Sequence, residues 1–395
     1  MTRTAEALVK PELLAWARRS IRMDVEEAAH KIGVKPETLA KWEAGEQRPT
    51  VRQLRDAAAV YKRPLAVFYL PEPPKEFDAM HDFRLLHGAE EAERSPALAL
   101  EIRRAIYRRE IAISLSQEIG EEIPEFAGQG TLNEDPDEFA KKVRGSLGLN
   151  QYDQPTFRNE YHAFNFWSEA IQERGVLVFQ TSHVELVEMR GLSISERLMP
   201  VIVVNAKDTP RGRIFTLMHE YVHLFLHKGG LCDLEEGDAH SAEDEATEIL
   251  CNRVAGAVLV PGPMLQEDDL VKNKRRTGEW DDKELGALSA KYQVSREVIL
   301  RRLVIVGKAT QDFYRQKRQQ WLRQYAQMKR GKGFISPTQE SVRNNGPRFV
   351  KLVLRAYNEE AITASDVSEF LGIRLKHLDA LVHTGREMFF LSTEC

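Results

Sequence analysis

The chain has 395 residues and a formal net charge of -4, with 42% hydrophobic and 29% charged residues. This balance excludes a disordered or fibrous chain, and the length exceeds the ~250 to 300 residues at which a single core stops growing, so we expect two or three domains. No apolar run approaches the ~20 residues of a membrane helix, the first residues lack the apolar core of a signal peptide, and three cysteines are too few for a disulfide scaffold. We therefore expect a cytoplasmic protein.

Residues 1–70 carry 13 Lys and Arg against 9 Asp and Glu, a net charge of +4, whereas the remainder carries -8. This segment is predicted to form short helices, because prolines and a capping aspartate precede its apolar runs and glycines follow them. Pro11, Asp24 and Pro36 mark helix starts, and Gly33 and Gly45 mark ends. Pro49 to Tyr61 and the stretch LAVFYL supply two more predicted helices.

The stretch VEEAAHKIGVKPETLAKWEAG has the spacing of two helices that cross at a tight turn, where Ala29 permits a close crossing and Gly33 forms the turn. The second helix would face a DNA major groove and its phosphates. The predicted DNA contacts are Lys35, Glu37, Thr38, Lys41, Gln47 and Arg48. From spacing alone, an ordinary helical hairpin is the alternative.

Residues 71–77 (PEPPKEF) are predicted to form a linker because of their proline content. Residues 95–120 have apolar positions at three- and four-residue intervals and are predicted to form one long helix. A further helix ending at Gly175 and two buried strands, VLVFQ (176–180) and the VIVV core of residues 199–207, come next. Residues 280–325 are predicted to be helical again, followed by a linker at 330–333 and a last helical unit.

Residues 215–227 (FTLMHEYVHLFLH) combine a helical apolar pattern with His219, Glu220 and His223. Positions i and i+4 of a helix share one face, so both imidazoles can reach one metal ion, and Glu220, turned by about 100°, can take a proton from bound water. An exposed helix face would need no metal. The neighbours here are apolar, however, and burial without a partner is costly, which favours a zinc site.

Zinc in a peptidase needs a third protein ligand, and the positions that would supply it within the same helix are Leu226 and Gly229. We therefore look to the predicted helix from Ser241 to about Val260. Glu248 lies in its apolar portion and is the favoured third ligand, and Glu245, nearer the polar first turn, is the competitor. His227 is one turn further along and is expected to be a structural or supporting residue.

Several weaker signals remain open. Tyr221, His227 and His240 are all candidates for stabilising an oxyanion, and Cys251 is either a ligand or redox group or a small buried hydrophobe. Residues 311–330 mix aromatic and basic side chains, which would suit a single-stranded DNA effector, but the four-residue spacing of the aromatics favours packing in a core. Residues 285–303 and 364–382 also have helix-turn-helix spacing, for which packing or dimerisation is favoured.

Two family resemblances support this interpretation. Residues 42–70 (WEAGEQRPTVRQLRDAAAVYKRPLAVFYL) resemble the XRE-type, lambda-repressor-like DNA-binding domain, over residues 10–70. RGRIFTLMHEYVHLFLH and EILCNRVAGAVLVP resemble the ImmA/IrrE family of zinc metallopeptidase-like proteins, whose pattern implies Glu248 as third zinc ligand and Asn252 as a supporting residue. Further stretches resemble the subgroup in which the two are fused.

The resemblances imply an α+β, mostly helical fold: an all-α helix-turn-helix domain (1–70), a linker and long helix (71–150), a zincin-like mixed α/β peptidase domain (151–270), a helical extension (271–330) and a helical C-terminal unit (331–395). They imply a transcriptional regulator that binds operator DNA as a homodimer and carries a Zn²⁺-dependent endopeptidase, which cleaves a protein partner such as a repressor in a stress or defence response. The alternative is a non-proteolytic repressor or antitoxin, with a toxin as partner and the zinc fold as a structural or sensing module.

Overall fold

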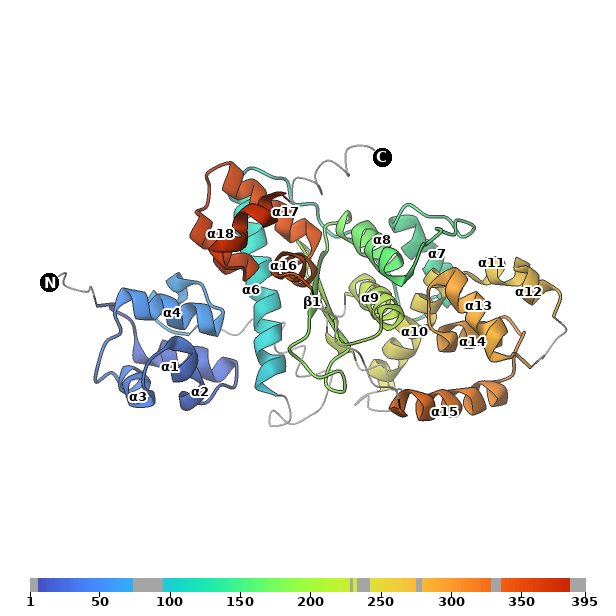
Figure 1. Ribbon diagram of the computed structural model, residues 1–395, viewed down its shortest axis with the longest axis horizontal. Coiled ribbons are helices and arrows are strands. Elements are labelled where there is room, and N and C mark those ends of the chain that lie inside the picture. Colours follow the sequence, from blue (N-terminus) through green and yellow to red (C-terminus); the bar gives the residue numbers. More distant parts are fainter. Residues whose placement is uncertain are drawn as a thin grey trace.

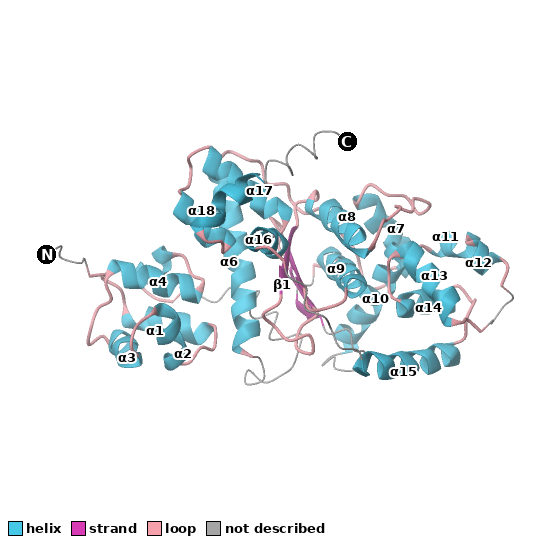
Figure 2. Ribbon diagram, in the orientation of Figure 1, coloured by secondary structure: helices cyan, strands magenta, loops and turns pink. Residues whose placement is uncertain are grey.

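The computed structural model describes residues 6–73, 95–227, 230–232, 242–274, 279–327 and 335–383. These residues form a mostly helical molecule with one small sheet near its middle (Figures 1 and 2). The N-terminal helices lie at one end, the C-terminal helices lie beside the long helix α6, and the helices that follow the sheet extend toward the other end (Figure 1). The expected fold class is therefore confirmed.

The N-terminal domain is a bundle of short helices whose ends follow local signals in the sequence. Its elements are α1 (Pro11–Ser20), α2 (Val25–Ile32), α3 (Pro36–Ala44), α4 (Val51–Tyr61) and a 3-10 helix, η1 (Leu65–Tyr69). The Asp24 side chain accepts a hydrogen bond from the N–H of Glu27 at the start of α2, and Gly33 ends α2 at φ 82°, a backbone conformation that glycine adopts without strain. Leu39 and Trp42 are fully buried in a core that belongs to this domain. The predicted helices are confirmed, except that the fifth is a 3-10 helix.

The sheet has four strands in the order β1-β3-β2-β4. They are β1 (Leu177–Thr181), β2 (Gly191–Ile194), β3 (Val201–Asn205) and β4 (Gly230–Cys232). β1 pairs parallel with β3, while β2 pairs antiparallel with both β3 and β4. Val178, Ile202 and Val204 enter one hydrophobic core, whereas Val201 and Val203 enter another. Successive side chains of a strand point to opposite faces, so the uninterrupted apolar run of β3 reflects burial on both sides.

The helices α8 (Glu160–Gln172) and α9 (Pro210–Phe225) cover one face of the sheet, and α10 (Ala242–Leu259) packs on α9. α7 (Pro136–Ser146), which the sequence analysis did not predict, packs on α10 through Phe139 and Val143. Five further helices extend this layer: α11 (Gly262–Glu267), α12 (Asp269–Lys272), α13 (Asp282–Tyr292), α14 (Arg296–Ile305) and α15 (Gln311–Gln327). Arg302 ties them to the layer by donating to the Val260 carbonyl and pairing with Asp137 at 2.6 Å.

The other face of the sheet is covered by α6 (Pro96–Glu118) together with the C-terminal helices. The latter are α16 (Pro337–Asn345), α17 (Pro347–Asn358), α18 (Ala364–Leu371) and the 3-10 helix η2 (Leu375–His377). Gly346 joins α16 to α17 where the backbone passes close to β1: a Cβ atom there would lie 2.1 Å from the Val178 carbonyl oxygen. The long predicted helix at 95–120 is confirmed as α6.

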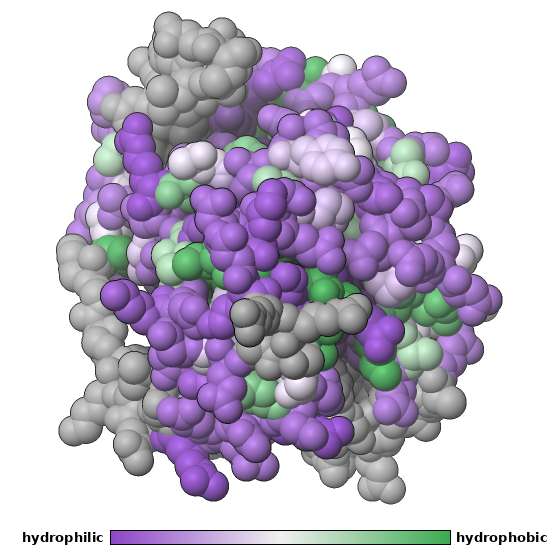
Figure 3. Space-filling model, turned by 90° about the vertical axis from the view of Figure 1, so that its right-hand side faces the viewer, coloured by the Kyte–Doolittle hydropathy of each residue, from purple (hydrophilic) through white to green (hydrophobic). Residues whose placement is uncertain are grey.

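The surface at the α11–α15 end is mainly hydrophilic, with hydrophobic side chains in small groups (Figure 3). Exposed apolar side chains on these helices include Leu270, Ile305 and Leu322. Within the described ranges, no helix combines the length and apolar character that crossing a bilayer would require.

Candidate metal centre

Two histidines on α9 and a glutamate on α10 converge on one point. His219 and His223 lie one helical turn apart on the same face of α9, and the packing of α10 on α9 brings Glu248 to both rings. The His219 Nε2 atom is 3.2 Å from Glu248 Oε2, and the His223 Nε2 atom is 3.1 Å from Glu248 Oε1. The two Nε2 atoms are 2.9 Å apart. All three ligand atoms lie within 4.8 Å of one another, which makes the group a candidate metal site.

The geometry of this group fits a small divalent ion. Two donors at ~2.0 to 2.1 Å from a tetrahedral zinc lie about 3.3 Å apart, close to the 2.9 Å between the imidazole nitrogens and to the 3.1 and 3.2 Å from each nitrogen to one of the two Glu248 oxygens. His219 is fully buried and His223 is 6% exposed, while the Glu248 side chain is 25% exposed. The centre is therefore most open to solvent on the Glu248 side. Two nitrogens and one oxygen also form a donor set that zinc accepts.

Glu220 lies next to this group and is itself fully buried. Its carboxylate oxygens make no well-formed hydrogen bond to a described residue, and the Thr216 hydroxyl and His219 Nδ1 also lack a partner among the described residues. Burial raises the pKa of Glu220, and the two histidines and the nearby Ser193 hydroxyl oppose this shift only in part. Burial of a carboxylate with few partners is costly, so this group of polar atoms is suited to a buried water molecule.

Gly191, the first residue of β2, lies directly against this carboxylate. A Cβ atom at Gly191 would come within 2.5 Å of Thr216 Cγ2 and 2.8 Å of Glu220 Oε1. Only a glycine allows the strand to pass this close to α9. Gly191 is not among the site residues predicted from the sequence. A glycine that opens a short apolar run is the signal that could have indicated such a close approach.

The charges of the ligand group support one another. Burial alone would lower the pKa of His223, but the Cys251 sulfur and the Glu248 carboxylate outweigh it and raise that pKa well above its usual value. Burial would likewise raise the pKa of Glu248, but the two imidazoles outweigh it and lower it. Cys251 is a free, buried cysteine beside His223 and is not one of the residues whose donor atoms converge. It belongs to the hydrophobic core and its sulfur also interacts with the His223 ring.

The remaining predicted residues of the centre lie as follows. Glu245, the competitor of Glu248, is exposed, and Asn252 is half-buried on α10. The Tyr221 hydroxyl lies 3.1 Å from Ser146 Oγ on α7, and its ring packs edge-on against Phe225. Tyr221 thus faces α7 rather than the ligands and is not available as an oxyanion donor. His227 is exposed just after α9, and His240 falls outside the described residues.

The predicted DNA-facing residues lie on or beside α3. Lys35 directly precedes α3 and is exposed. On α3, Glu37 and Lys41 are exposed and Thr38 is half-buried. Gln47 and Arg48 are exposed in the loop that follows. Glu37 and Lys41 lie on the side of α3 away from Leu39 and are free to meet a ligand from solvent, whereas Thr38 lies one turn before Trp42 on the same face.

The aromatic and basic stretch on α15 packs into the protein. Tyr314 and Trp321 are buried, and Phe313 packs against the same core. Arg296 lies over the Trp321 ring at 5.2 Å from its centroid. These rings are therefore core residues and are not available to stack on nucleic-acid bases.

Two protein-family models match the chain. The helix-turn-helix model matches residues 14–68, and the model described as IrrE N-terminal-like domain, of peptidase family M78, matches residues 171–304. None of the curated proteins matches the chain. The second match spans the sheet, α9, α10 and the helices through most of α14, so it includes all three converging side chains and Glu220.

Proposed function

Because the chain joins an XRE-type helix-turn-helix domain to a domain of the IrrE/ImmA-like peptidase family, we propose that it is a DNA-binding regulator with a zinc-dependent endopeptidase activity. The observation that carries this proposal is the convergence of His219, His223 and Glu248 beside the fully buried carboxylate of Glu220. A structural metal site has no need of such a carboxylate. A hydrolytic site needs a proton acceptor there.

His219, His223 and Glu248 would hold the zinc ion. When bound, zinc supplies Lewis-acid chemistry: it acidifies a water molecule and polarises a substrate carbonyl. Glu220 would accept the proton of the attacking water and return it to the leaving amine, a role that its raised pKa suits. Gly191 would hold β2 against Glu220 and so fix the position of that carboxylate. Asn252, half-buried one helical turn after Glu248, would support α10 at the centre.

The domain combination supports a proposal for the substrate class. A regulator that binds an operator through α3 is positioned to act on other proteins at that operator, so we propose that it cleaves a partner such as a repressor, in the cytoplasm, during a stress or defence response. Lys35, Glu37, Thr38, Lys41, Gln47 and Arg48 would form the DNA contacts. A homodimer would supply two α3 helices for two half-sites one helical turn apart.

The test is a cleavage assay on the products of the genes that flank this one, with wild type and Glu220→Gln compared with and without single-stranded DNA. We expect wild type to cleave a partner and Glu220→Gln to lose at least about 10²-fold in rate while keeping its zinc, because the variant removes the proton acceptor and leaves the ligands in place. Equal cleavage by the two proteins would refute the role of Glu220.

A second candidate function is a non-proteolytic repressor or antitoxin that uses the metal centre for stability or sensing. The burial of His219 and Glu220 favours it, since both are fully inaccessible and a substrate cannot reach them without a local opening. In this case operator binding and toxin neutralisation are unchanged in Glu220→Gln, and no flanking gene product is cleaved. The same set of proteins therefore separates the two functions.

A further inference from the structure

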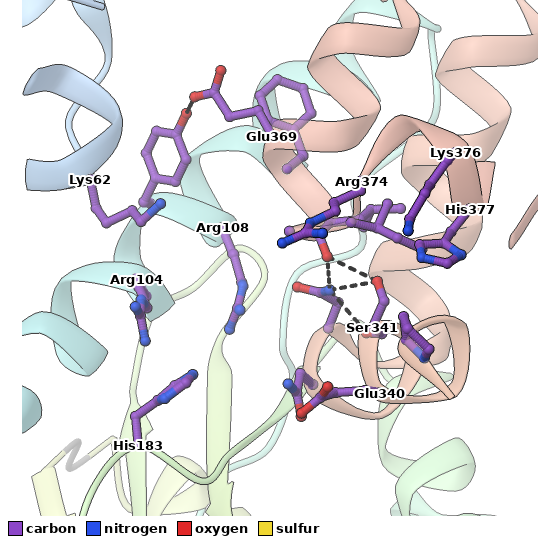
Figure 4. Close-up of a pocket in the computed structure, with 18 residues that line it drawn as sticks. Lys62, Arg104, Arg108, His183, Glu340, Ser341, Glu369, Arg374, Lys376 and His377 are labelled. Carbon is purple, nitrogen blue, oxygen red and sulfur yellow. Dashed lines mark hydrogen bonds between the residues drawn. The ribbon is translucent and has the colours of Figure 1, made fainter. Parts of the chain in front are cut away.

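A cavity of about 650 Å³ lies where three parts of the chain meet. Lys62, just after α4, comes from the N-terminal domain, and α6 forms one wall. His183, which follows β1, lies below, and α16, α18 and η2 close the opposite side (Figure 4). Its volume is within the ~300 to 1,000 Å³ range of small-molecule sites. The cavity is remote in sequence from the metal ligands, and neither proposed function uses it.

The lining of this cavity is rich in positive charge. Five lysine or arginine side chains and two histidines face it, against two glutamates. One of these, Glu369, accepts a hydrogen bond from the Tyr107 hydroxyl at 3.0 Å. Arg104 and Arg108 extend from α6, and the Arg374 guanidinium reaches toward Arg108 from the C-terminal unit (Figure 4). Positive groups from separate elements thus face a common space.

Two of the arginines have unused hydrogen-bonding capacity. Arg108 Nη1 is buried without a hydrogen-bond partner among the described residues and lies 3.8 Å from Glu101, a carboxylate already engaged by Arg104 and by the Thr181 hydroxyl. The Arg374 side chain is exposed, and the described part of the chain provides no hydrogen bond or ion pair for it. Arg108 therefore has only a long ion pair with a shared carboxylate, and Arg374 has no described partner, so both guanidinium groups can take phosphate oxygens.

Two pKa shifts at this cavity reflect burial first and a neighbouring positive charge second. Burial and the neighbouring Arg104 lower the pKa of Lys62 to about 8. Burial and Arg104 also lower the pKa of His183. Both groups are therefore pushed toward their neutral forms, and a bound anion would reverse that effect. Lys62 also has φ 51°, a left-handed conformation that is unfavourable for a side-chain-bearing residue, and the Arg103 Nε atom donates to its carbonyl oxygen at 2.7 Å.

We propose that this cavity binds a small phosphate-bearing ligand of the nucleotide class. The arginines would take the phosphates, and Phe370 and Tyr107, which also line the cavity, provide aromatic surface for a base. Asn344 on α16 adds a polar side chain for a sugar or a base edge, while the Ser341 hydroxyl beside it already donates to the Leu371 carbonyl. The ligand would bridge Lys62 at the end of the DNA-binding domain, α6 and the C-terminal unit. It would thereby couple the position of the DNA-binding domain to the rest of the molecule.

The test is calorimetric titration of the zinc-loaded full-length protein with ATP at about 0.15 M salt, so that weak surface charge effects are screened. We expect saturable binding, competition by inorganic pyrophosphate, and an affinity about tenfold lower in Arg374→Ala, because a charge-assisted contact is lost. Arg374→Ala should fold normally, since this side chain is exposed. Lys62→Gly removes a second cation at a position where glycine relieves the backbone, and should weaken ATP binding by a similar factor.

The matched control is Arg315→Ala, which removes an exposed arginine on α15 outside the cavity and should bind ATP as wild type does. A 5′-phosphorylated single-stranded oligonucleotide forms a third arm that separates a free nucleotide from a DNA end. The proposal is overturned if ATP does not bind saturably, if Arg374→Ala and Lys62→Gly bind it as tightly as Arg315→Ala, or if only the oligonucleotide binds. Because binding is the readout, the result does not depend on peptidase activity.

Discussion

Replacement of Gly191 by alanine tests how closely β2 is fitted to the candidate catalytic carboxylate. The added Cβ would lie 2.5 Å from Thr216 Cγ2 and 2.8 Å from Glu220 Oε1, whereas ordinary contacts are 3.4–4 Å. Thr216 or β2 must therefore move by about 1 Å in a fully packed region. Overpacking of this kind costs about 1 to 3 kcal/mol, and a displacement of about 1 Å at a catalytic group lowers a rate by about 10²-fold.

The assay combines thermal unfolding with cleavage of the partner identified among the flanking gene products. At about 2 to 4 °C per kcal/mol, the expected fall in Tm is roughly 2 to 12 °C. Zinc content should be unchanged, because the three proposed ligands lie on α9 and α10. The matched control is Gly286→Ala on α13, where an added Cβ meets nothing within 4 Å and alanine favours the helix. A Gly191→Ala protein with wild-type Tm and wild-type cleavage rate would refute this reasoning.

Three further predictions concern packing and the metal. Gly346→Ala should lower the free energy of unfolding by about 3 kcal/mol or more in a denaturant titration, because φ is 72° and the new Cβ would overlap the Val178 carbonyl. Gly372 is also left-handed, but an added Cβ meets nothing there, so Gly372→Ala should cost about 1 kcal/mol. Removal of zinc with a chelator should lower Tm, with full recovery on adding zinc back; an unchanged Tm would contradict a bound metal. Zinc affinity should fall as pH decreases from 8 toward 6, because the raised pKa of His223 makes protons compete with zinc for the ring. In the metal-free protein, the ion pair of His223 with Glu248 should stabilise the fold at pH values above the usual pKa of a glutamate. This stabilisation should be lost as pH rises through the raised pKa of His223. A zinc titration with the same midpoint at pH 6 and pH 8 would contradict the predicted fall in zinc affinity.

The geometry that the sequence could indicate depends on local signals. The helices of residues 1–70 begin and end at capping residues and glycines whose effect is contained within one turn, as at Asp24 and Gly33. The face shared by His219 and His223 follows from helical periodicity alone. Glu248 could be singled out because a carboxylate in an apolar part of a helix requires a positive partner, and the structure places it beside both rings.

The features that the sequence did not indicate depend on contacts between distant segments. β2 and β4 are three or four residues long, too short for a strand pattern to be read. α7 lies in a segment that was interpreted as linker, and it is stabilised by burial of Phe139 against α10. The cavity at Lys62 and Arg374 joins residues more than three hundred positions apart, so no local pattern could indicate it.

The central claim is that one divalent ion is held by His219, His223 and Glu248. It is tested most directly by multi-element mass spectrometry of the purified protein alongside Glu248→Ala and Glu220→Gln. We expect about one zinc per chain in wild type and in Glu220→Gln, and a large loss of zinc in Glu248→Ala, because three protein ligands are needed for tight binding. A wild-type protein without metal, or a Glu248→Ala protein that keeps its full zinc content, would contradict the account.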